Sequence, residues 1–258
     1  MKSKLSVVLA TYNEEKNIKS CLDSVKNLAD EIVVVDGTSQ DKTRQIAKKM
    51  AARVFKVKNV PIFHKNKQKA VDKAKYDWIL QLDADERVSP ELKKEIKTII
   101  KNKQSKDGYY LPRKNWFLTR FLTKGGQYPD YVIRLFKKGK GSFPCETVHE
   151  QISINGQVGH LKQDLIHYSD PNFKRYMSRF NRYTNLDADK LFKDKIKPSL
   201  FLGFQYFITK PIYWFLLTFI RHKGFVDGLP GFIFSLMSSL RFPVTFIKLW
   251  ELNYARRS

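Results

Sequence analysis

Hydrophobic and polar positions alternate along the first hundred residues in the order of an open α/β sheet. Runs of mainly apolar residues at 5–10 and 32–35 predict strands that are buried on both faces, as parallel strands between helices are. Between them, apolar residues spaced by four and three positions predict one face of a helix within 15–29. Strand, helix and strand in this order predict a βαβ unit.

The next elements repeat this alternation. They are helices over 43–52 and 65–75, strands over 53–57 and 78–82, and a helix ending near Lys101. The last helix has a clear start, because Ser89 is a favoured N-cap and is followed by proline and glutamate. Strands that alternate with helices predict a mainly parallel sheet with flanking helices.

From about Gly108 the pattern changes to short aromatic segments and glycine turns, which predict further strands, and a helical stretch follows at about 172–195. Three strongly apolar segments then occupy 197–221, 224–240 and 242–250. Lys210 and Pro211 interrupt the first of these near its middle. None supplies the roughly 20 consecutive apolar residues of a membrane span.

Aromatic residues beside lysine and arginine in these last segments are typical of helices that lie in a membrane interface. We therefore expect amphipathic, interfacial or re-entrant helices there. A true span and an apolar oligomer contact are the alternatives.

Composition limits the choice of partners. The chain has 258 residues with 48 Lys+Arg against 25 Asp+Glu, a net charge of +23, and its 42% hydrophobic content excludes a disordered chain. Such a charge predicts an anionic partner: nucleic acid, anionic lipid headgroups or a phosphorylated substrate. The apolar run between Lys4 and Thr11 is too short for the core of a signal peptide.

Cysteine and histidine usage argues against a zinc site. Two cysteines, Cys21 and Cys145, favour a reducing, intracellular compartment and exclude a cysteine zinc site. The spacing of His149, His160 and His167 also matches no common zinc signature.

In an open α/β sheet, ligands bind beyond the carboxyl ends of the strands. The first predicted strand ends in Thr11, Tyr12, Asn13 and Glu14, which either bond a nucleotide or cap the next helix. Asp36 ends the second strand, where a carboxylate accepts hydrogen bonds from a ribose or base, or simply begins a turn.

The strongest local signal is the segment WILQLDADE. Asp83 and Asp85 follow a buried strand at a spacing of two, so extended backbone places both carboxylates on one side. Two like charges aimed together are costly unless a cation lies between them. Carboxylate oxygens completed by substrate phosphates favour Mg²⁺ or Mn²⁺. A solvated acidic turn is the alternative.

Together the segments LSVVLATYNEEKNIKSCLDSV, EIVVVDGTSQDKT and WILQLDADE resemble the inverting family-two glycosyltransferases of the GT-A fold. The later segments YPDYVIRLFKKGKGSF, VHEQISINGQVGHL and LIHYS resemble the branch that transfers glucose to lipopolysaccharide core. The resemblance implies an α/β, Rossmann-like GT-A catalytic domain over 1–170. Its nucleotide-binding half is expected at 1–105 and its acceptor half at 106–170. A helical membrane-interface region at 171–258 is expected to follow.

The resemblance also assigns site residues. It implies a nucleotide-sugar pocket formed by Thr11, Tyr12, Asn13, Glu14, Asp36, Lys65, Gln68, Lys69 and Asp83. By their own chemistry, Arg134 and His149 are further candidates to contact the diphosphate. Asp36 is expected to contact the uridine. Asp83 and Asp85 correspond to the DxD pair, with Asp85 as the more direct metal ligand.

For several of these residues a structural role is the alternative. Lys65, Gln68 and Lys69 also fit a solvated basic helix face, Arg134 a structural ion pair, and His149 a bond within its loop.

An inverting transfer needs a base on the acceptor side. The resemblance makes Glu150 the candidate, with Asp130 as the alternative.

The expected activity is transfer of a hexose, glucose first, from a UDP-sugar to a membrane-associated glycan or lipid such as lipopolysaccharide core, with Mg²⁺ or Mn²⁺. An anionic membrane surface is the expected partner, at the cytoplasmic face of the cell membrane and in a peripheral or monotopic arrangement, with Arg256 and Arg257 adding positive charge. No nucleic acid partner is expected. The alternatives are a nucleotidyltransferase of the same fold class and a basic nucleic-acid-binding protein.

Overall fold

A computed structural model describes residues 3–60, 62–145 and 151–254. The chain forms two compact units. The first contains the residues up to Arg113 together with Asp130–His167, and the second contains Lys114–Pro129 together with the chain from Tyr168 onward. The segment Lys114–Pro129 therefore belongs with the C-terminal helices, although strands of the first unit flank it in sequence.

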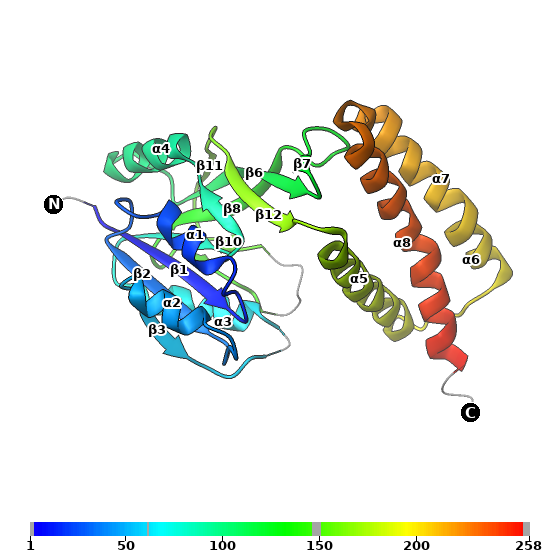
Figure 1. Cartoon of the computed structure of the whole chain (residues 1–258), viewed down its shortest axis with the longest axis horizontal. Helices are drawn as coiled ribbons and strands as arrows, with labels where there is room; N and C mark the ends of the chain where they lie inside the picture. Colours follow the sequence, from blue (N-terminus) through cyan, green and yellow to red (C-terminus); the bar gives the residue numbers. More distant parts are fainter. Residues whose placement is uncertain (1–2, 61, 146–150, 255–258) are drawn as a thin grey trace. The chain divides into compact units, whose positions relative to one another are not determined.

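One half of the sheet of the first unit is parallel. Its strands are, in spatial order, β3 (Arg53–Lys56), β2 (Glu31–Asp36), β1 (Leu5–Thr11) and β4 (Trp78–Leu82) (Figure 1). The helices that connect and follow them are α1 (Ile18–Ser24), α2 (Thr43–Lys49), α3 (His64–Asp72) and α4 (Pro90–Lys101). The predicted α/β class is confirmed, and its parallel part is formed by the first hundred residues.

The other half of the sheet is mostly antiparallel, so the complete sheet is mixed. It continues from β4 with β8 (Asp130–Lys137), β6 (Gly108–Phe117), β12 (Leu165–Asp170) and β5 (Glu86–Val88). Four short strands remain. Two pair with β6, namely β7 (Arg120–Phe121) and β11 (Val158–His160), and the other two, β9 (Gly141–Ser142) and β10 (Ser153–Ile154), form a separate two-stranded sheet. The change of direction falls between β4 and β8, beside the aspartates that follow β4.

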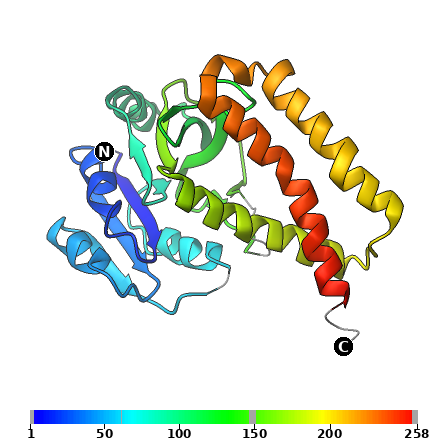
Figure 2. The ribbon, with the colours of Figure 1, turned by 45° about the vertical axis from the view of Figure 1, so that its right-hand side comes forward.

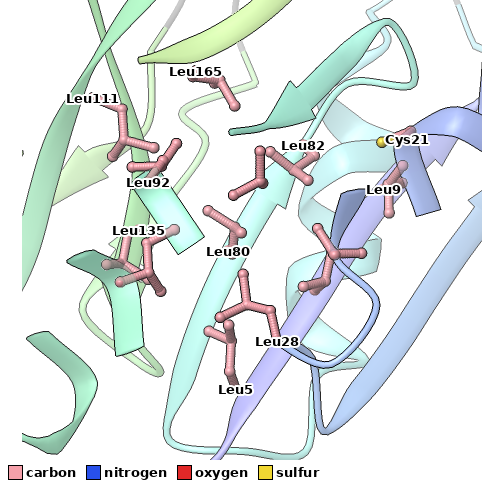
Figure 3. Close-up of a cluster of buried hydrophobic side chains, with 14 of the residues drawn as sticks. Leu5, Leu9, Cys21, Leu28, Leu80, Leu82, Leu92, Leu111, Leu135 and Leu165 are labelled. Atoms are coloured by element: carbon pink, nitrogen blue, oxygen red, sulfur yellow. The ribbon is translucent and has the colours of Figure 1, made fainter. Parts of the chain in front are cut away.

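The parallel strands are buried on both faces. On one face, leucines such as Leu5, Leu9 and Leu80 pack with Cys21 of α1 and Leu92 of α4 (Figure 3). On the other face, valines of β1 and β2 pack with residues of α3. Burying each large aliphatic side chain stabilises the fold by about 1.5–3 kcal/mol.

Helix boundaries follow local signals where these are strong. The hydroxyl of Ser89 accepts a hydrogen bond from the amide of Leu92 at 3.1 Å, and α4 ends at Lys101, as predicted. Helix α1 is shorter than the predicted 15–29 because the chain leaves the helix at Val25 and Asn27 adopts a positive φ of 62°.

The second unit is helical. Helix α5 (Phe173–Lys193) is followed by a run over 200–221 in which two π-helical segments, η1 (Gln205–Thr209) and η2 (Leu216–Arg221), alternate with α6 (Leu200–Phe204) and α7 (Lys210–Phe215). A short 3₁₀ helix, η3 (Gly224–Asp227), leads into the long helix α8 (Gly228–Tyr254).

Lys210 and Pro211 interrupt the apolar run but not the helix, so the expectation that no segment is long enough to span a membrane is wrong. Helical backbone continues through both residues, because the π-helical segment η1 immediately before them changes the hydrogen-bonding pattern where proline supplies no N–H. The two later apolar segments are likewise one helix, with Pro243 inside α8. Three predicted segments are thus two helices.

These two helices, Leu200–Arg221 and Gly224–Tyr254, are long and apolar enough to cross a membrane by length and composition. They run side by side, and α8 also packs on α5 (Figure 2). Their outward residues are apolar: Leu200 is 96% exposed and Leu229 69%. Small polar side chains, Thr218, Ser235, Ser239 and Thr245, are buried instead. Such a surface is consistent with membrane association.

Hydrogen bonds and apolar contacts join the segment Lys114–Pro129 to the helices of the second unit. Asp227 is 1% exposed and accepts hydrogen bonds from the amides of Thr123 and Lys124 at 2.9 and 2.8 Å. Phe117 and Leu122 are buried, and Phe117 makes edge contacts with Tyr176 and Phe234. The segment Lys114–Pro129 is therefore fixed to the helices by both polar and apolar contacts.

Candidate active site

Asp83 follows β4 and is held between two cations. One carboxylate oxygen forms an ion pair with the ammonium of Lys67, and the other accepts a hydrogen bond from Arg134 at 2.8 Å. Burial alone would raise the pKa of Asp83, but these two cations outweigh it and hold the pKa well below its usual range. Asp83 is therefore a fixed negative charge.

Arg134 of β8 is 7% exposed and links Asp83 to a deeper carboxylate. Its guanidinium donates to Gln81 at 2.6 Å and to the fully buried Glu86 at 2.8 Å. Burial opposes the charged form, but Glu86 and Asp83 raise the pKa of Arg134 above its ordinary value. Glu86 also accepts a hydrogen bond from the amide of Asp83 at 2.9 Å, so it fixes the backbone of the DxD segment.

Asp85 lies beside a histidine. The Nε2 atom of His167 is 3.6 Å from Oδ1 of Asp85, and both side chains are largely buried. The register of β12 with β5, which pairs His167 with Glu86, brings this histidine to the DxD segment. A carboxylate oxygen and an imidazole nitrogen at this separation fit as two neighbouring ligands of one divalent cation. Among residues 3–60, 62–145 and 151–254, no group of three such side chains is found.

The ends of β1 and β2 form a hydrogen-bonded loop. Asp36 is fully buried and accepts hydrogen bonds from the amide of Ser39 at 2.8 Å and from the hydroxyl of Thr11 at 3.2 Å. The hydroxyl of Ser39 in turn accepts a hydrogen bond from the amide of Asn13 at 2.9 Å. Asp36 thus orders the backbone that follows both strands.

Other residues of this loop are accessible. Asn13 has a positive φ of 55°, a conformation that asparagine tolerates, and its side chain accepts a hydrogen bond from the amide of Gln40 at 2.8 Å. Tyr12 is 44% exposed, and Glu14 accepts a hydrogen bond from the side chain of Asn17. Because Leu9 pairs with Leu82, the loop lies beside the DxD segment at the same sheet edge.

Helix α3 presents a different lysine from those predicted. Lys65 and Lys69 are exposed, whereas Lys67 is buried and reaches Asp83. Successive helical residues differ by about 100°, so Lys67 lies on the opposite face from its neighbours two positions away. Burial lowers the pKa of Lys67, and Asp83 opposes that shift. Gln68 accepts a hydrogen bond from the amide of Phe143 at 2.8 Å and anchors the strand end there.

Of the two candidate bases, only Asp130 lies within the described residues. Glu150 and the neighbouring His149 lie outside the described residues. Asp130 is described, and its Oδ2 accepts two hydrogen bonds from Arg113, at 2.9 and 2.6 Å. Arg113 also lies 3.5 Å from Glu86. Asp130 is therefore the outer end of a chain of alternating charges that begins at Lys67.

Comparison with known proteins decides the family. The model of the family described as glycosyl transferase family 2 matches residues 6–152, more than half of the chain. The chain belongs to this family.

Family members with curated names resemble the chain over nearly its whole length. An uncharacterized glycosyltransferase of Rickettsia bellii is 33% identical over 97% of this chain and 87% of its own. The lipopolysaccharide core biosynthesis glycosyltransferase LpsC of Rhizobium meliloti is 25% identical over 96% of this chain and 92% of its own. Among solved structures, S. aureus TarS 1-349 in complex with UDP has a TM-score of 0.49 at 16% identity, covering 99% of this chain and 92% of that one.

Family 2 membership makes the chain a glycosyltransferase enzyme with a GT-A core, so the expected family and fold are confirmed. Sequence reasoning missed Lys67, Glu86, Arg113 and His167 as parts of the site. Helical periodicity is the signal that separates Lys67 from Lys65 and Lys69. No signal in the sequence brings His167 to Asp85, because strand register alone does so.

Proposed function

We propose that this family 2 enzyme transfers a hexose from a UDP-sugar to a membrane-associated glycan or lipid, with inversion at the anomeric carbon. Glucose is the first candidate for this hexose. The observation that carries the proposal is the arrangement after β4. Asp83 is ionised and paired with Lys67 and Arg134, while Asp85 and His167 lie together at the edge of the sheet. One carboxylate is thus structural, and the other is placed for a ligand.

A divalent cation, Mg²⁺ or Mn²⁺, fits between Asp85 and His167, and a donor diphosphate would complete its ligands. When bound, this ion offsets the negative charge of the diphosphate. Asp83 supports the site indirectly, because its ion pairs with Lys67 and Arg134 fix the backbone that carries Asp85. Arg134 has the same supporting role through Asp83 and Glu86.

The loop after β1 and β2 is proposed to hold the nucleoside. Tyr12 is accessible for stacking on a base, and Asn13 and Glu14 supply polar atoms beside it. Asp36 and Thr11 set the shape of this loop through their mutual hydrogen bond. Lys65 and Lys69 add positive charge on the exposed face of α3, and His149 remains a proposed diphosphate contact.

The proposed base is Glu150, which takes the proton of the acceptor hydroxyl. The acceptor oxygen then bonds to the anomeric carbon as the bond to the diphosphate oxygen breaks, which inverts the configuration. The two hydrogen bonds from Arg113 to Asp130 favour this assignment, since they occupy an oxygen of the alternative base.

The acceptor is proposed to be a glycan or lipid at the cytoplasmic face of the membrane, such as lipopolysaccharide core. The name of the relative LpsC supports the lipopolysaccharide class. The exposed apolar helices and the net charge of +23 support a peripheral or monotopic association with an anionic membrane.

Calorimetric titration of UDP, with and without Mn²⁺, tests the site directly. We expect metal-dependent binding that Asp85→Asn and His167→Gln each weaken by about tenfold or more, the range for loss of a metal ligand or its support. Asp23→Asn changes an exposed acid on α1 and serves as the control. Binding of UDP that is unaffected by Mn²⁺ in the unmodified protein would refute the proposed metal site.

Product analysis tests the chemistry. With UDP-glucose and a truncated lipopolysaccharide acceptor, nuclear magnetic resonance should show an anomeric configuration opposite to that of the donor. A Glu150→Gln variant should lose about 10²–10⁴-fold in turnover while UDP binding is unchanged, as expected for a general base. Full turnover in this variant, with loss in Asp130→Asn, would assign the base to Asp130.

A further inference from the structure

Two adjoining cavities lie in the second unit, where α5 ends and the run over 200–221 begins. The first, here the basic cavity, has a volume of about 640 Å³ and is lined by Asp189, Phe192, Lys193, Lys195, Ile196, Lys197, Leu252 and Asn253. The second, here the apolar groove, has a volume of about 670 Å³, and its lining includes Lys197, Leu200, Gly203, Phe246, Trp250 and Asn253.

We propose that these two cavities together form a binding site for one anionic phospholipid, with its phosphate in the basic cavity and an acyl chain in the apolar groove. The proposal deepens the membrane association proposed above by assigning a single lipid molecule to a defined site. It does not depend on the donor, the metal or the acceptor.

Charge selects the headgroup. Three lysines and one aspartate line the basic cavity, so its lining carries a net positive charge. Lysine is a strong partner for phosphate oxygens. A zwitterionic headgroup brings its own ammonium into the same space and gains less from these lysines. The lining therefore favours a lipid with a net negative charge.

The shape of the groove selects the rest of the ligand. Aromatic rings from both of its helices line it, including Phe204 and Phe207 on one side and Phe246 and Trp250 on the other. Phe207 and Phe246 meet at a ring separation of 5.5 Å. Each cavity falls within the range of about 300–1,000 Å³ that is usual for ligand sites.

The two cavities are continuous in their lining, because Lys197 and Asn253 belong to both. One molecule with a charged end and an apolar end therefore matches them better than two separate ligands. Leu200, which lines the groove, is 96% exposed, so the groove opens on the apolar surface that a bilayer would cover.

Lys195, the second of the three lysines that line the basic cavity, has an unusual backbone conformation. Lys195 has a positive φ of 59° just after the end of α5, a position where glycine is usual. Its amide donates to the carbonyl of Phe192 at 3.0 Å, and the amide of Ile196 donates to that of Leu191 at 3.0 Å. The chain thus keeps a cationic side chain where a glycine would relieve strain.

Quenching of tryptophan fluorescence by brominated lipids tests the proposal in the full chain, held in non-ionic detergent micelles. Brominated phosphatidylglycerol is compared with brominated phosphatidylcholine. We expect half-maximal quenching at a concentration about tenfold lower for the anionic lipid. Trp250→Phe should remove the difference in quenching between the two lipids, since Trp250 lines the groove. Equal quenching by the two lipids would overturn the proposal.

Matched variants separate the site from general charge. Replacing Lys193, Lys195 and Lys197 by glutamine should abolish the preference for the anionic lipid. Replacing Lys174, Arg221 and Lys223 by glutamine removes the same charge from exposed positions outside both cavities and should leave the preference intact. Equal loss in both triple variants would overturn the site and leave only a diffuse electrostatic effect.

A second pair of variants tests the groove. A Cβ atom at Gly203 would lie 3.5 Å from the ring of Phe246, an ordinary contact, so Gly203→Ala should keep the anionic preference. Gly203→Leu fills the groove and should abolish it. Retention in Gly203→Leu, or a dimer in micelles without lipid preference, would overturn the proposal.

Sedimentation with vesicles distinguishes this proposal from the membrane association on which it rests. Binding to phosphatidylglycerol vesicles without any lipid preference in micelles refutes only the defined site. Absence of vesicle binding refutes the association itself.

Discussion

The two units place charge and apolar surface in opposite ways. In the first unit, apolar side chains fill both faces of the sheet, and ionised groups such as Asp83, Glu86 and Arg134 are buried only in pairs. In the second unit, large apolar residues such as Leu200 and Leu229 face outward, while hydroxyl side chains lie between the helices.

The difference is consistent with different surroundings for the two units. Burial of apolar side chains away from water stabilises the first unit. The buried carboxylates of Asp83 and Glu86 are tolerated there because each has a cationic partner. The second unit exposes the kind of surface that water disfavours and buries the small polar residues that let helices approach closely. A membrane interface is the surrounding that suits this arrangement.

Breaking one buried ion pair should produce the largest effect. Lys67→Met leaves Asp83 with Arg134 alone, and we expect a loss of about 3 kcal/mol from the first unit because a buried charge loses a partner. Hydrogen exchange of the β4 amides, read by mass spectrometry, reports on this unit specifically. Lys69→Met, on the exposed face of the same helix, should change the stability by less than about 0.5 kcal/mol. Equal exchange in the two variants would contradict the role given to Lys67.

The polar interior of the second unit should be the next most sensitive. Asp227→Ala removes the acceptor for the amides of Thr123 and Lys124, and an unsatisfied buried amide costs about 1–3 kcal/mol. Faster hydrogen exchange at 120–124 should result. Asp187→Ala, at an exposed position of α5, is the control and should leave those amides protected.

A smaller effect that depends on pH is expected at the edge of the first unit. Burial raises the pKa of Glu31, but hydrogen bonds from Ser6, Lys75 and Arg53 outweigh burial and lower it. A carboxylate with a lowered pKa in the folded state stabilises above its unfolded pKa, and that contribution is lost as the pH falls. Glu31→Gln should therefore cost about 1–2 kcal/mol at pH 7 and less at pH 3, by urea unfolding. A constant difference across this range would show that charge is not the cause.

The smallest effect on stability is expected on the outer surface of the helices. Leu200→Gln with Ile212→Gln changes side chains that are 96% and 55% exposed, so stability in detergent should change by less than about 0.5 kcal/mol. Vesicle binding should fall by about tenfold, since apolar area no longer enters the interface. The same change at the fully buried Leu80 should cost about 3 kcal/mol or more. Unchanged vesicle binding in the double variant would place the membrane contact elsewhere.

Sequence patterns predict the parallel half of the fold well, because each of its elements is specified locally. The strand over 78–82 and the helix that Ser89 caps are found at the predicted positions. The antiparallel half depends on pairing between distant segments, such as β12 with β5, and no local pattern sets that register. The continuity of the helix through Pro211 depends on a π-helical segment that composition does not reveal.

The candidate site was predictable to the same extent. The segments that carry Thr11, Asp36 and Asp83 are visible in the sequence, since Thr11 and Asp36 end buried strands and Asp83 directly follows one. The ion pairs of Asp83 and the neighbour of Asp85 are not, because they come from α3, β8 and β12.

The membership of Lys114–Pro129 in the second unit has a practical consequence for dissecting the enzyme. A truncation that ends at His167 would remove every helix of the second unit but keep this segment. Phe117 and Leu122, now 2% and 1% exposed, would lose Tyr176 and Phe234 as packing partners. The two units are interleaved along the chain, so a single cut that removes the C-terminal helices leaves Lys114–Pro129 without the side chains it packs on. Deletion of the helices is therefore not neutral for the part of the chain that remains.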